Sequence, residues 1–232
     1  SSMVQSMLSL VQESSIREMI LELSKYKNRY YKSKFGVQSQ EFIEKKWKSI
    51  IGKKSYISVR SYEHAKWPQP SIILTIEGKK KKDEHIIIGG HADSIAGWFR
   101  RESATAPGAD DNASGIATMT EMIRILSQSD FRPDRTIKFI AYAAEEVGLL
   151  GSMAIAKEYK EKNINVVGVV QFDMTNYKGS KDLDIVFMSD YTNDAQNEFL
   201  GSLVDKYLPD LTWGYSRCGY ACSDHASWHN AG

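Results

Sequence analysis

A set of side chains that could bind a metal ion or move a proton follows runs of apolar residues in this sequence. They are one histidine and six carboxylates: His91, Asp93, Asp110, Asp111, Glu145, Glu146 and Asp173. The apolar runs are typical of buried strands, and the ends of strands in one sheet converge on one edge. Imidazole and carboxylate groups gathered there would form a metal-binding crevice rather than a local motif.

His91 and Asp93 end the apolar run that begins at Ile86. Because side chains alternate along a strand, both point to the same side. Either Asp93 orients a metal-bound His91 ring or both residues are ligands, and a histidine at a strand end taken alone is more often structural. Asp173 ends another apolar run and has no basic neighbour in the sequence to offset its charge, which favours a cation as its partner.

Two acidic pairs complete the set. Asp110, Asp111 and Asn112 precede a predicted helix, and three capping residues in succession exceed what one helix needs, so we expect at least one aspartate to face a cation. Glu145 and Glu146 follow an apolar strand, where adjacent carboxylates need a cation or a raised pKa. Since neighbouring side chains on extended backbone point apart, one glutamate could bind metal while the other acts as a general base.

The elements that position these residues alternate between strand and helix. Two amphipathic helices are predicted in the first fifty residues, followed by strands at 56–62 and 71–77. We expect the lysine run at 79–82 to form a charged turn of a hairpin-like meander. The remaining predicted strands are 84–89, 135–144, 166–172 and 184–188, and the helices are 113–129, 148–160 and 195–207. This order predicts an α/β fold, with a largely parallel sheet, helices on both faces and antiparallel strands at one side.

Length and composition support one domain. The 232 residues are 42% hydrophobic, and 30 basic against 29 acidic residues give a net charge of +1. We therefore expect no nucleic-acid partner and, without a run of about 20 apolar residues, no membrane span. No basic and apolar segment typical of a signal peptide opens the sequence, and we expect such a segment to have been removed. Cys218 and Cys222 lie within reach of a disulfide across a turn, the alternative being two free thiols; a disulfide would indicate an oxidising compartment.

Five segments carry a resemblance to a known family: GGHADS, PGADDNASG, AYAAEEVGLLGS, QFDMTNYKGS and CGYACSDHASWHNAG. They resemble the secreted bacterial leucyl aminopeptidases of the co-catalytic di-zinc metallopeptidase family. The resemblance implies a three-layer α/β/α fold of the zinc-exopeptidase type with a mixed, mostly parallel central sheet. It also implies a secreted monomer that removes a hydrophobic, Leu-like residue from peptides with a free N-terminus.

The same resemblance assigns roles to the acidic set and implies two zinc ions. Asp111, rather than Asp110, would bridge them, and the peptide bond after it would be cis. His91 and Asp173 would complete one zinc site and Glu146 would bind the other ion. Glu145 would be the general base that takes a proton from the metal-activated water.

The remaining roles concern orientation and substrate. Asp93 would orient the His91 ring. An apolar pocket for the N-terminal side chain would be walled by Met174, Met188, Cys218, Tyr220 and Cys222. Tyr220 could also donate a hydrogen bond to the tetrahedral intermediate, or simply pack.

The sequence departs from the family pattern at its end. Members supply a last histidine to the Glu146 zinc from a later segment, so we expect residues 1–232 to form one peptidase domain that lacks its C-terminal segment. His225 and His229, four apart on a predicted helix, are the alternative ligands. The alternative functions are a glutaminyl-cyclase-like single-zinc acyl transferase, and an inactive or binding-only form.

Overall fold

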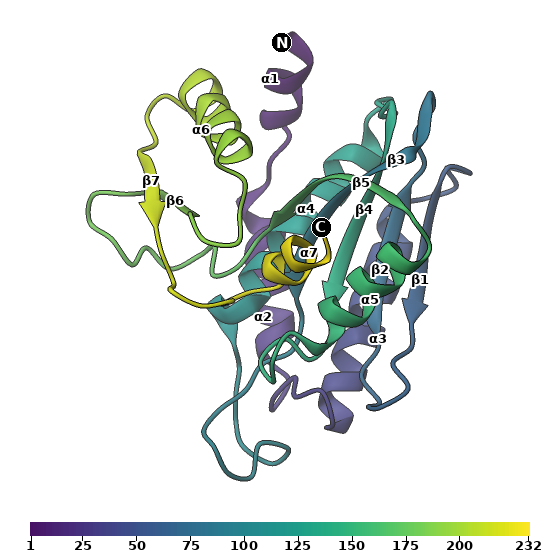
Figure 1. The fold of residues 1–232 in the computed structure, drawn as a ribbon, viewed down its shortest axis with the longest axis vertical. Coiled ribbons are helices and arrows are strands. Elements are labelled where there is room, and N and C mark those ends of the chain that lie inside the picture. The colour runs from purple at the N-terminus through teal and green to yellow at the C-terminus, as the bar shows by residue number, and fades with distance from the viewer.

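The computed structural model describes all 232 residues, and a five-stranded sheet forms its centre (Figure 1). Strand β2 alone is antiparallel to its neighbours, so four of the five strands run in one direction. The predicted mixed, mostly parallel sheet is therefore confirmed. From one edge to the other the strands are β1 (Ile57–Tyr62), β2 (Ser71–Ile76), β4 (Arg135–Tyr142), β3 (Lys81–His91) and β5 (Asn165–Gln171).

Helices cover both faces of this sheet, which gives three layers (Figure 1). The strands alternate accordingly: Ile72 and Leu74 pack in the larger apolar cluster, whereas Ile73 packs in the smaller one on the opposite face. The larger cluster involves α2 (Glu13–Ser24), α3 (Lys34–Ile50) and α4 (Gly115–Gln128), and the smaller involves α5 (Leu150–Glu161) and α7 (His225–Ala231). The predicted three-layer fold is confirmed.

A smaller part of the chain lies to one side of the central sheet (Figure 1). It contains a two-stranded parallel sheet and a helix packed on it, with the Trp213 ring against Gly201 of the helix. These elements are β6 (Ile185–Met188), α6 (Asp194–Tyr207) and β7 (Trp213–Ser216), and the predicted strand at 184–188 thus joins a separate sheet. The short N-terminal helix α1 (Ser2–Leu8) buries no residue.

The predicted meander around the lysine run is wrong. Strand β4 lies between β2 and β3, so those two strands are not paired. The amides of Lys79 and Lys81 donate to the carbonyls of Pro133 and Asp134. These bonds hold the start of β3 beside the start of β4. None of the helices is both long and apolar enough to span a membrane.

Candidate functional site

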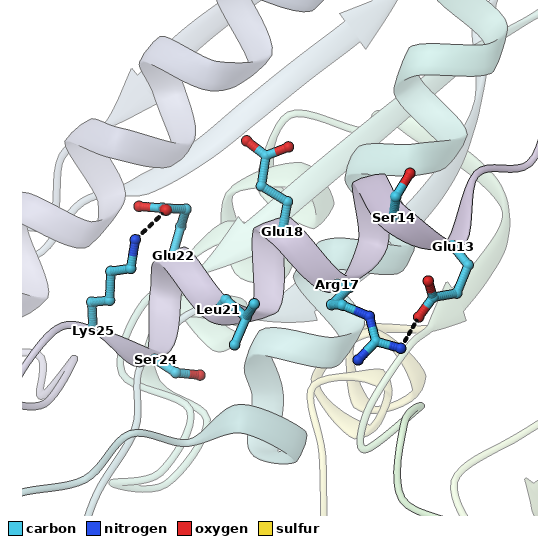
Figure 2. Close-up of a pocket in the computed structure, with 8 residues that line it drawn as sticks. All are labelled: Glu13, Ser14, Arg17, Glu18, Leu21, Glu22, Ser24 and Lys25. Atoms are coloured by element: carbon cyan, nitrogen blue, oxygen red, sulfur yellow. Dashed lines mark hydrogen bonds and ion pairs between the residues drawn. The ribbon is translucent and has the colours of Figure 1, made fainter.

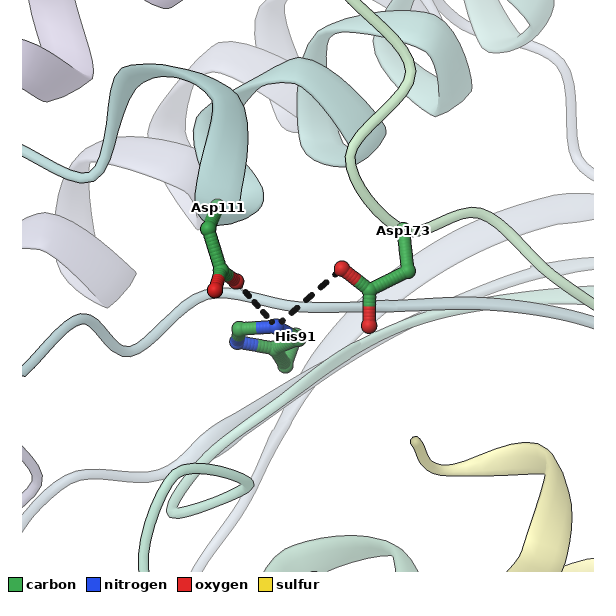
Figure 3. Close-up of side chains that lie close together, drawn as sticks. All are labelled: His91, Asp111 and Asp173. Atoms are coloured by element: carbon green, nitrogen blue, oxygen red, sulfur yellow. Dashed lines mark ion pairs between the residues drawn. The ribbon is translucent and has the colours of Figure 1, made fainter. Parts of the chain in front are cut away.

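His91, at the end of β3, brings the acidic set together (Figure 3). Its Nε2 atom lies 3.0 Å from Asp111 Oδ1, 3.6 Å from Asp173 Oδ1 and 3.7 Å from Glu145 Oε2. Asp111 comes from the kinked loop before α4 and Asp173 from the loop after β5, so three separate segments meet. One potential ligand atom from each of His91, Asp111 and Asp173 lies within 4.8 Å of the others.

The chemistry of this group fits a cation. The Nε2 atom of His91 is buried without a hydrogen-bond partner, although three carboxylates surround it. Burial raises the pKa of Glu145 to about 9, and burial with repulsion from Asp111 raises the pKa of Glu146 to about 8. Carboxylates that would otherwise hold protons become favourable ligands or bases once a divalent ion offsets their charge. One imidazole with several carboxylates is a donor set that suits zinc.

The loop that carries Asp111 also fixes the segment that carries Asp173. The loop, η1 (Ala109–Ser114), is kinked at Asp111 and Asn112, where the backbone is not helical, and the peptide bond after Asp111 is cis, as expected. Asn112 is buried; its Nδ2 donates to Phe172 O at 2.9 Å and its Oδ1 accepts from Met174 N at 3.2 Å. Asn112 is therefore hydrogen-bonded to the backbone on both sides of Asp173.

Asp110 has a different task from its neighbour Asp111. Its Oδ1 accepts the backbone amides of Asn176 and Tyr177, both at 2.9 Å. Ser114 adds to this link, since its hydroxyl accepts from Thr175 N at 2.9 Å. The second aspartate of the pair faces His91, and the first holds the following loop in place.

The segment before and through the glutamate pair is held by four consecutive backbone amides. Ala143 N donates to Ser71 Oγ at 3.0 Å and Ala144 N to Gln69 Oε1 at 3.4 Å. The next two amides donate to the two carboxylate oxygens of Asp93: Glu145 N to Oδ1 at 2.9 Å and Glu146 N to Oδ2 at 3.1 Å. Hydrogen bonds to a charged acceptor are stronger than those to a neutral one, so Asp93 fixes the backbone of Glu145 and with it the direction of its side chain.

Asp93 is thus tied more closely to the glutamates than to the histidine. The Nδ1 atom of His91 lies 3.1 Å from the backbone carbonyl of Asp93 and 3.5 Å from its carboxylate. The sequence predicts that the Asp93 side chain orients the imidazole of His91, but the closer contact is with the backbone carbonyl of Asp93. The carboxylate instead connects the end of β3 to the segment after β4.

A hollow of about 2070 Å³ is lined by all the predicted pocket residues and by the five predicted ligand and base residues His91, Asp111, Glu145, Glu146 and Asp173. Met188 at the end of β6 lies with its Sδ atom 3.5 Å from Cys218 Sγ. Cys218 and Cys222 form the predicted disulfide. Met174 and Tyr220 are more exposed, at 58% and 65%. The predicted wall therefore stands beside the acidic group, on loops and on the small sheet.

His225 and His229 lie on α7, as the sequence predicts, but they turn toward another segment. The Nε2 atom of His225 lies 3.2 Å from Asp190 O, and the ring of His229 packs edge-on against Tyr191. Neither belongs to the group of potential ligand atoms around His91. Ser223, just before α7, does reach this group, because its hydroxyl donates to Asp173 Oδ2 at 2.5 Å.

A second hollow, of about 560 Å³, runs along the outer face of α2 (Figure 2). Four of its five charged residues are paired with each other, Arg17 with Glu13 at 2.5 Å and Lys25 with Glu22, and the fifth, Glu18, lies 3.7 Å from Lys46 Nζ. Only Leu21 among its lining residues is apolar. Paired and exposed charges of this kind form a solvated helix face, so we assign no site here.

Sequence reasoning missed several residues that support the site. Gln69 and Ser71 precede or begin a strand, and Arg29 stands between two helices, so nothing in their spacing indicates a link to the acidic group. All three are fully buried. Their side chains bind mainly backbone atoms, which carry no signal in a side-chain pattern.

Comparison with known proteins gives the relatives of this chain. The sequence profile described as peptidase family M28 matches residues 71–232. The chain is 38% identical to leucine aminopeptidase 1 of the fungus Pyrenophora teres f. teres, over 97% of this chain and 60% of that protein. The chain thus spans about three fifths of the length of the curated relatives it matches.

Solved structures agree with the sequence comparison. The LapA aminopeptidase of Legionella pneumophila has a TM-score of 0.90 and 33% identity, with 99% of this chain and 60% of that one covered. BSAP, a zinc aminopeptidase from Bacillus subtilis, has a TM-score of 0.56 and 29% identity over 70% of this chain and 38% of that one. A glutaminyl cyclase from Bacteroides thetaiotaomicron shares the fold alone, at 17% identity.

Proposed function

Because the chain belongs to peptidase family M28, we propose that it is a zinc aminopeptidase, which removes the N-terminal residue of peptides. The names of its relatives support this activity, since the fungal protein is a leucine aminopeptidase and the Legionella protein an aminopeptidase. The observation that carries the proposal is the buried Nε2 atom of His91, which has no hydrogen-bond partner among three surrounding carboxylates.

His91, Asp111 and Asp173 would hold one zinc ion, a proposal supported by potential ligand atoms that lie within 4.8 Å of one another. Glu146, which lines the same hollow, would contribute to a second zinc site together with Asp111. Zinc supplies a Lewis acid for the scissile carbonyl and lowers the pKa of a water molecule. Ser223 holds the second oxygen of Asp173, which leaves its first oxygen free to point at the ion.

Glu145 is the residue that we propose to move the proton. Its carboxylate is only 9% exposed and lies beside His91 at 3.7 Å. The Asp93 carboxylate accepts a hydrogen bond from the amide of Glu145, which fixes the backbone that carries the Glu145 side chain. It would accept a proton from the attacking water and donate that proton to the nitrogen of the leaving amine.

The hollow supports a preference for a hydrophobic N-terminal residue with a free amine. Its acidic side favours a positively charged chain end, and its sulfur-rich wall at Met188 and Cys218 suits a Leu-like side chain. Hydrolysis of leucine p-nitroanilide by the zinc-loaded chain tests the activity. Release of nitroaniline that a chelator abolishes and zinc restores is expected; an inert chain with bound zinc would contradict the proposal.

The alternative activities are separated by the same assay. The glutaminyl-cyclase-like reading has support from the fold alone and is not favoured. A peptide with N-terminal glutamine should be cleaved slowly or left intact, and cyclisation without cleavage of the leucine substrate would reverse our choice. Zinc binding without any turnover would favour a binding-only protein.

We also propose that the protein works outside the reducing cytoplasm as a monomer. The Cys218–Cys222 disulfide supports the first part, because such bonds persist in oxidising compartments. Light scattering of the purified chain measures its mass directly, and a value near 26.2 kDa is expected for a monomer of these residues.

A further inference from the structure

Arg29 is a fully buried arginine that contacts the backbone next to the candidate metal site. It lies between α2 and α3, and its guanidinium forms no ion pair. All of its side-chain hydrogen bonds go to backbone carbonyls: Nε donates to Ala92 O at 2.7 Å, Nη1 to Leu23 O and Pro107 O, and Nη2 to Gly108 O at 2.9 Å. A buried charge held only by main-chain oxygens is unusual, since most buried cations have an acidic partner.

The carbonyls that Arg29 binds belong to the two segments that carry potential ligands. Ala92 stands between His91 and Asp93 at the end of β3. Pro107 and Gly108 come directly before the loop of Asp111. One planar group thus connects the histidine segment to the aspartate loop, and Leu23 anchors both to α2.

The backbone of Arg29 adds a link of its own. Its amide donates to Ser94 Oγ at 3.0 Å, and the same hydroxyl donates to Ala106 O at 2.7 Å. There is little slack around this contact: a Cβ at Gly108 would lie 2.6 Å from Ser94 Cβ and 2.8 Å from Arg29 Nη2. The two ligand segments are therefore held at one separation by arginine and serine together.

The charge of Arg29 also acts on the site. Burial lowers the pKa of its guanidinium to about 10, which leaves it positive at neutral pH, and the nearby charges of Asp93, Asp111 and Glu146 favour that charged form. The attraction of this fixed positive charge for the carboxylates offsets part of their mutual repulsion before any metal ion arrives.

We propose that Arg29 is a positioning residue for zinc, which holds His91 and Asp111 at ligand spacing by clamping the carbonyls beside them. The inference rests on the proposed zinc site. It predicts that the residue affects the affinity of the metal and the geometry around it, although Arg29 touches neither the ion nor the substrate. Supporting groups around metal ligands characteristically change affinity in this way.

The test compares Arg29→Met, Arg29→Lys and the control Arg17→Met in the full 232-residue chain. Arg17 lies on the exposed face of α2, so its variant makes the same chemical change without touching the site (Figure 2). Zinc affinity is measured by competition with a chromophoric chelator, and the visible absorption of bound Co²⁺ reports ligand geometry. The unfolding midpoint without metal is recorded for each variant.

We expect Arg29→Met to weaken zinc binding about tenfold or more and to change the Co²⁺ spectrum. Arg29→Lys restores the charge but cannot reach all the carbonyls, so it should recover part of the affinity. Arg17→Met should match the wild type. If Arg29→Met lowers the unfolding midpoint but keeps the zinc affinity and the Co²⁺ spectrum, the residue is only structural and the inference is wrong.

If Arg29→Met fails to fold, Ser94→Ala provides a second test of the inference. It removes one link between the segments and leaves the charge of Arg29 in place. A loss of affinity by about threefold is expected, corresponding to one weakened hydrogen bond. Wild-type affinity in both Ser94→Ala and Arg29→Lys would overturn the inference. A wild-type chain that binds no zinc would instead remove the proposed metal site itself.

Discussion

Two aspartates do the same structural work in two regions of the molecule. Asp93 lies beside the proposed zinc ligands, a region we call the metal-binding side, and accepts hydrogen bonds from the amides of Glu145 and Glu146. Asp190 lies beside the proposed pocket wall, which we call the pocket side, and accepts hydrogen bonds from the amides of Cys218 at 3.3 Å and Gly219 at 2.7 Å. The first bonds are buried among paired strands, whereas the second join exposed loops beside the two-stranded sheet. The same pair of bonds therefore holds the backbone of the proposed base and of a proposed ligand in one region, and the backbone of the proposed pocket wall in the other.

The comparison separates chemistry from selectivity. Residues of the metal-binding side follow β3, β4 and β5 of the central sheet, while the pocket wall depends on β6 and the segment of the disulfide. Changes on the first side should reduce turnover or metal binding, and changes on the second should mainly alter KM. Four predictions test this division.

The largest expected effect comes from Glu145→Gln. The variant keeps the shape of the side chain but cannot accept a proton, so kcat should fall by about 10²–10⁴-fold. Hydrolysis of leucine p-nitroanilide measures this, and zinc affinity by chelator competition should stay close to that of the wild type. Glu18→Gln, on the exposed face of α2, is the matched control (Figure 2). Normal turnover in Glu145→Gln would remove the base from our account.

Asp93→Asn should have the next largest effect. The amide keeps one oxygen but places an NH₂ group against a backbone amide that needs an acceptor. We expect kcat and zinc affinity to fall by about 10–100-fold with little change in KM. A change confined to KM would place Asp93 on the pocket side and break the comparison.

Stability of the metal-free chain should depend on pH through the buried acids. Burial raises the pKa of Glu145 to about 9 and that of Glu146 to about 8, so the folded chain holds more protons than the unfolded chain between pH 4.5 and 9. Stability therefore falls as pH rises through this window. The unfolding midpoint should be lower at pH 9 than at pH 6 by several degrees, because each proton held only by the folded chain changes its stability by about 1.4 kcal/mol per pH unit.

Zinc provides the contrast for that pH series. Bound metal favours the ionised carboxylates, so saturating zinc should reduce or abolish the decline between pH 6 and pH 9. Differential scanning calorimetry with and without the metal gives both curves. A metal-free chain that gains stability toward pH 9 would show that these glutamates are not buried together in the folded state.

The smallest expected effect belongs to Asp190→Asn on the pocket side. Its bonds are partly exposed to solvent, which screens them, so loosening the Cys218 segment should raise KM by about threefold. We expect kcat and zinc affinity to remain as in the wild type. An Asp190→Asn variant that lost zinc would show that the two regions are not separable.

The sequence predicts that His91, Glu145 and Asp173 lie together because each follows a strand of one sheet, whereas Asp111 lies in the loop before α4. His91, Glu145 and Asp173 follow apolar runs, and the carboxyl ends of β3, β4 and β5 meet because these strands are parallel neighbours. The same runs do not fix the order of the strands. Strand β4 pairs with both β2 and β3 through long-range ladders that the apolar runs do not specify, so the predicted meander is wrong.

The supporting residues could not be predicted from patterns of side chains. Arg29 has no acidic partner, and Gln69 and Ser71 bind backbone amides, so their importance arises only when distant segments come together. Asp93 illustrates the same limit, since its type and position indicated the histidine as its partner. Its carboxylate instead meets two amides about fifty residues later in the chain.

The most direct test of the central claim is X-ray diffraction from zinc-soaked crystals, recorded on both sides of the zinc absorption edge. We predict an anomalous peak bonded to His91 Nε2 and to carboxylate oxygens of Asp111 and Asp173, with a second peak beside Glu146 at sufficient zinc. A well-ordered crystal with no peak at His91, or with zinc bound only at His225 and His229, would contradict the account.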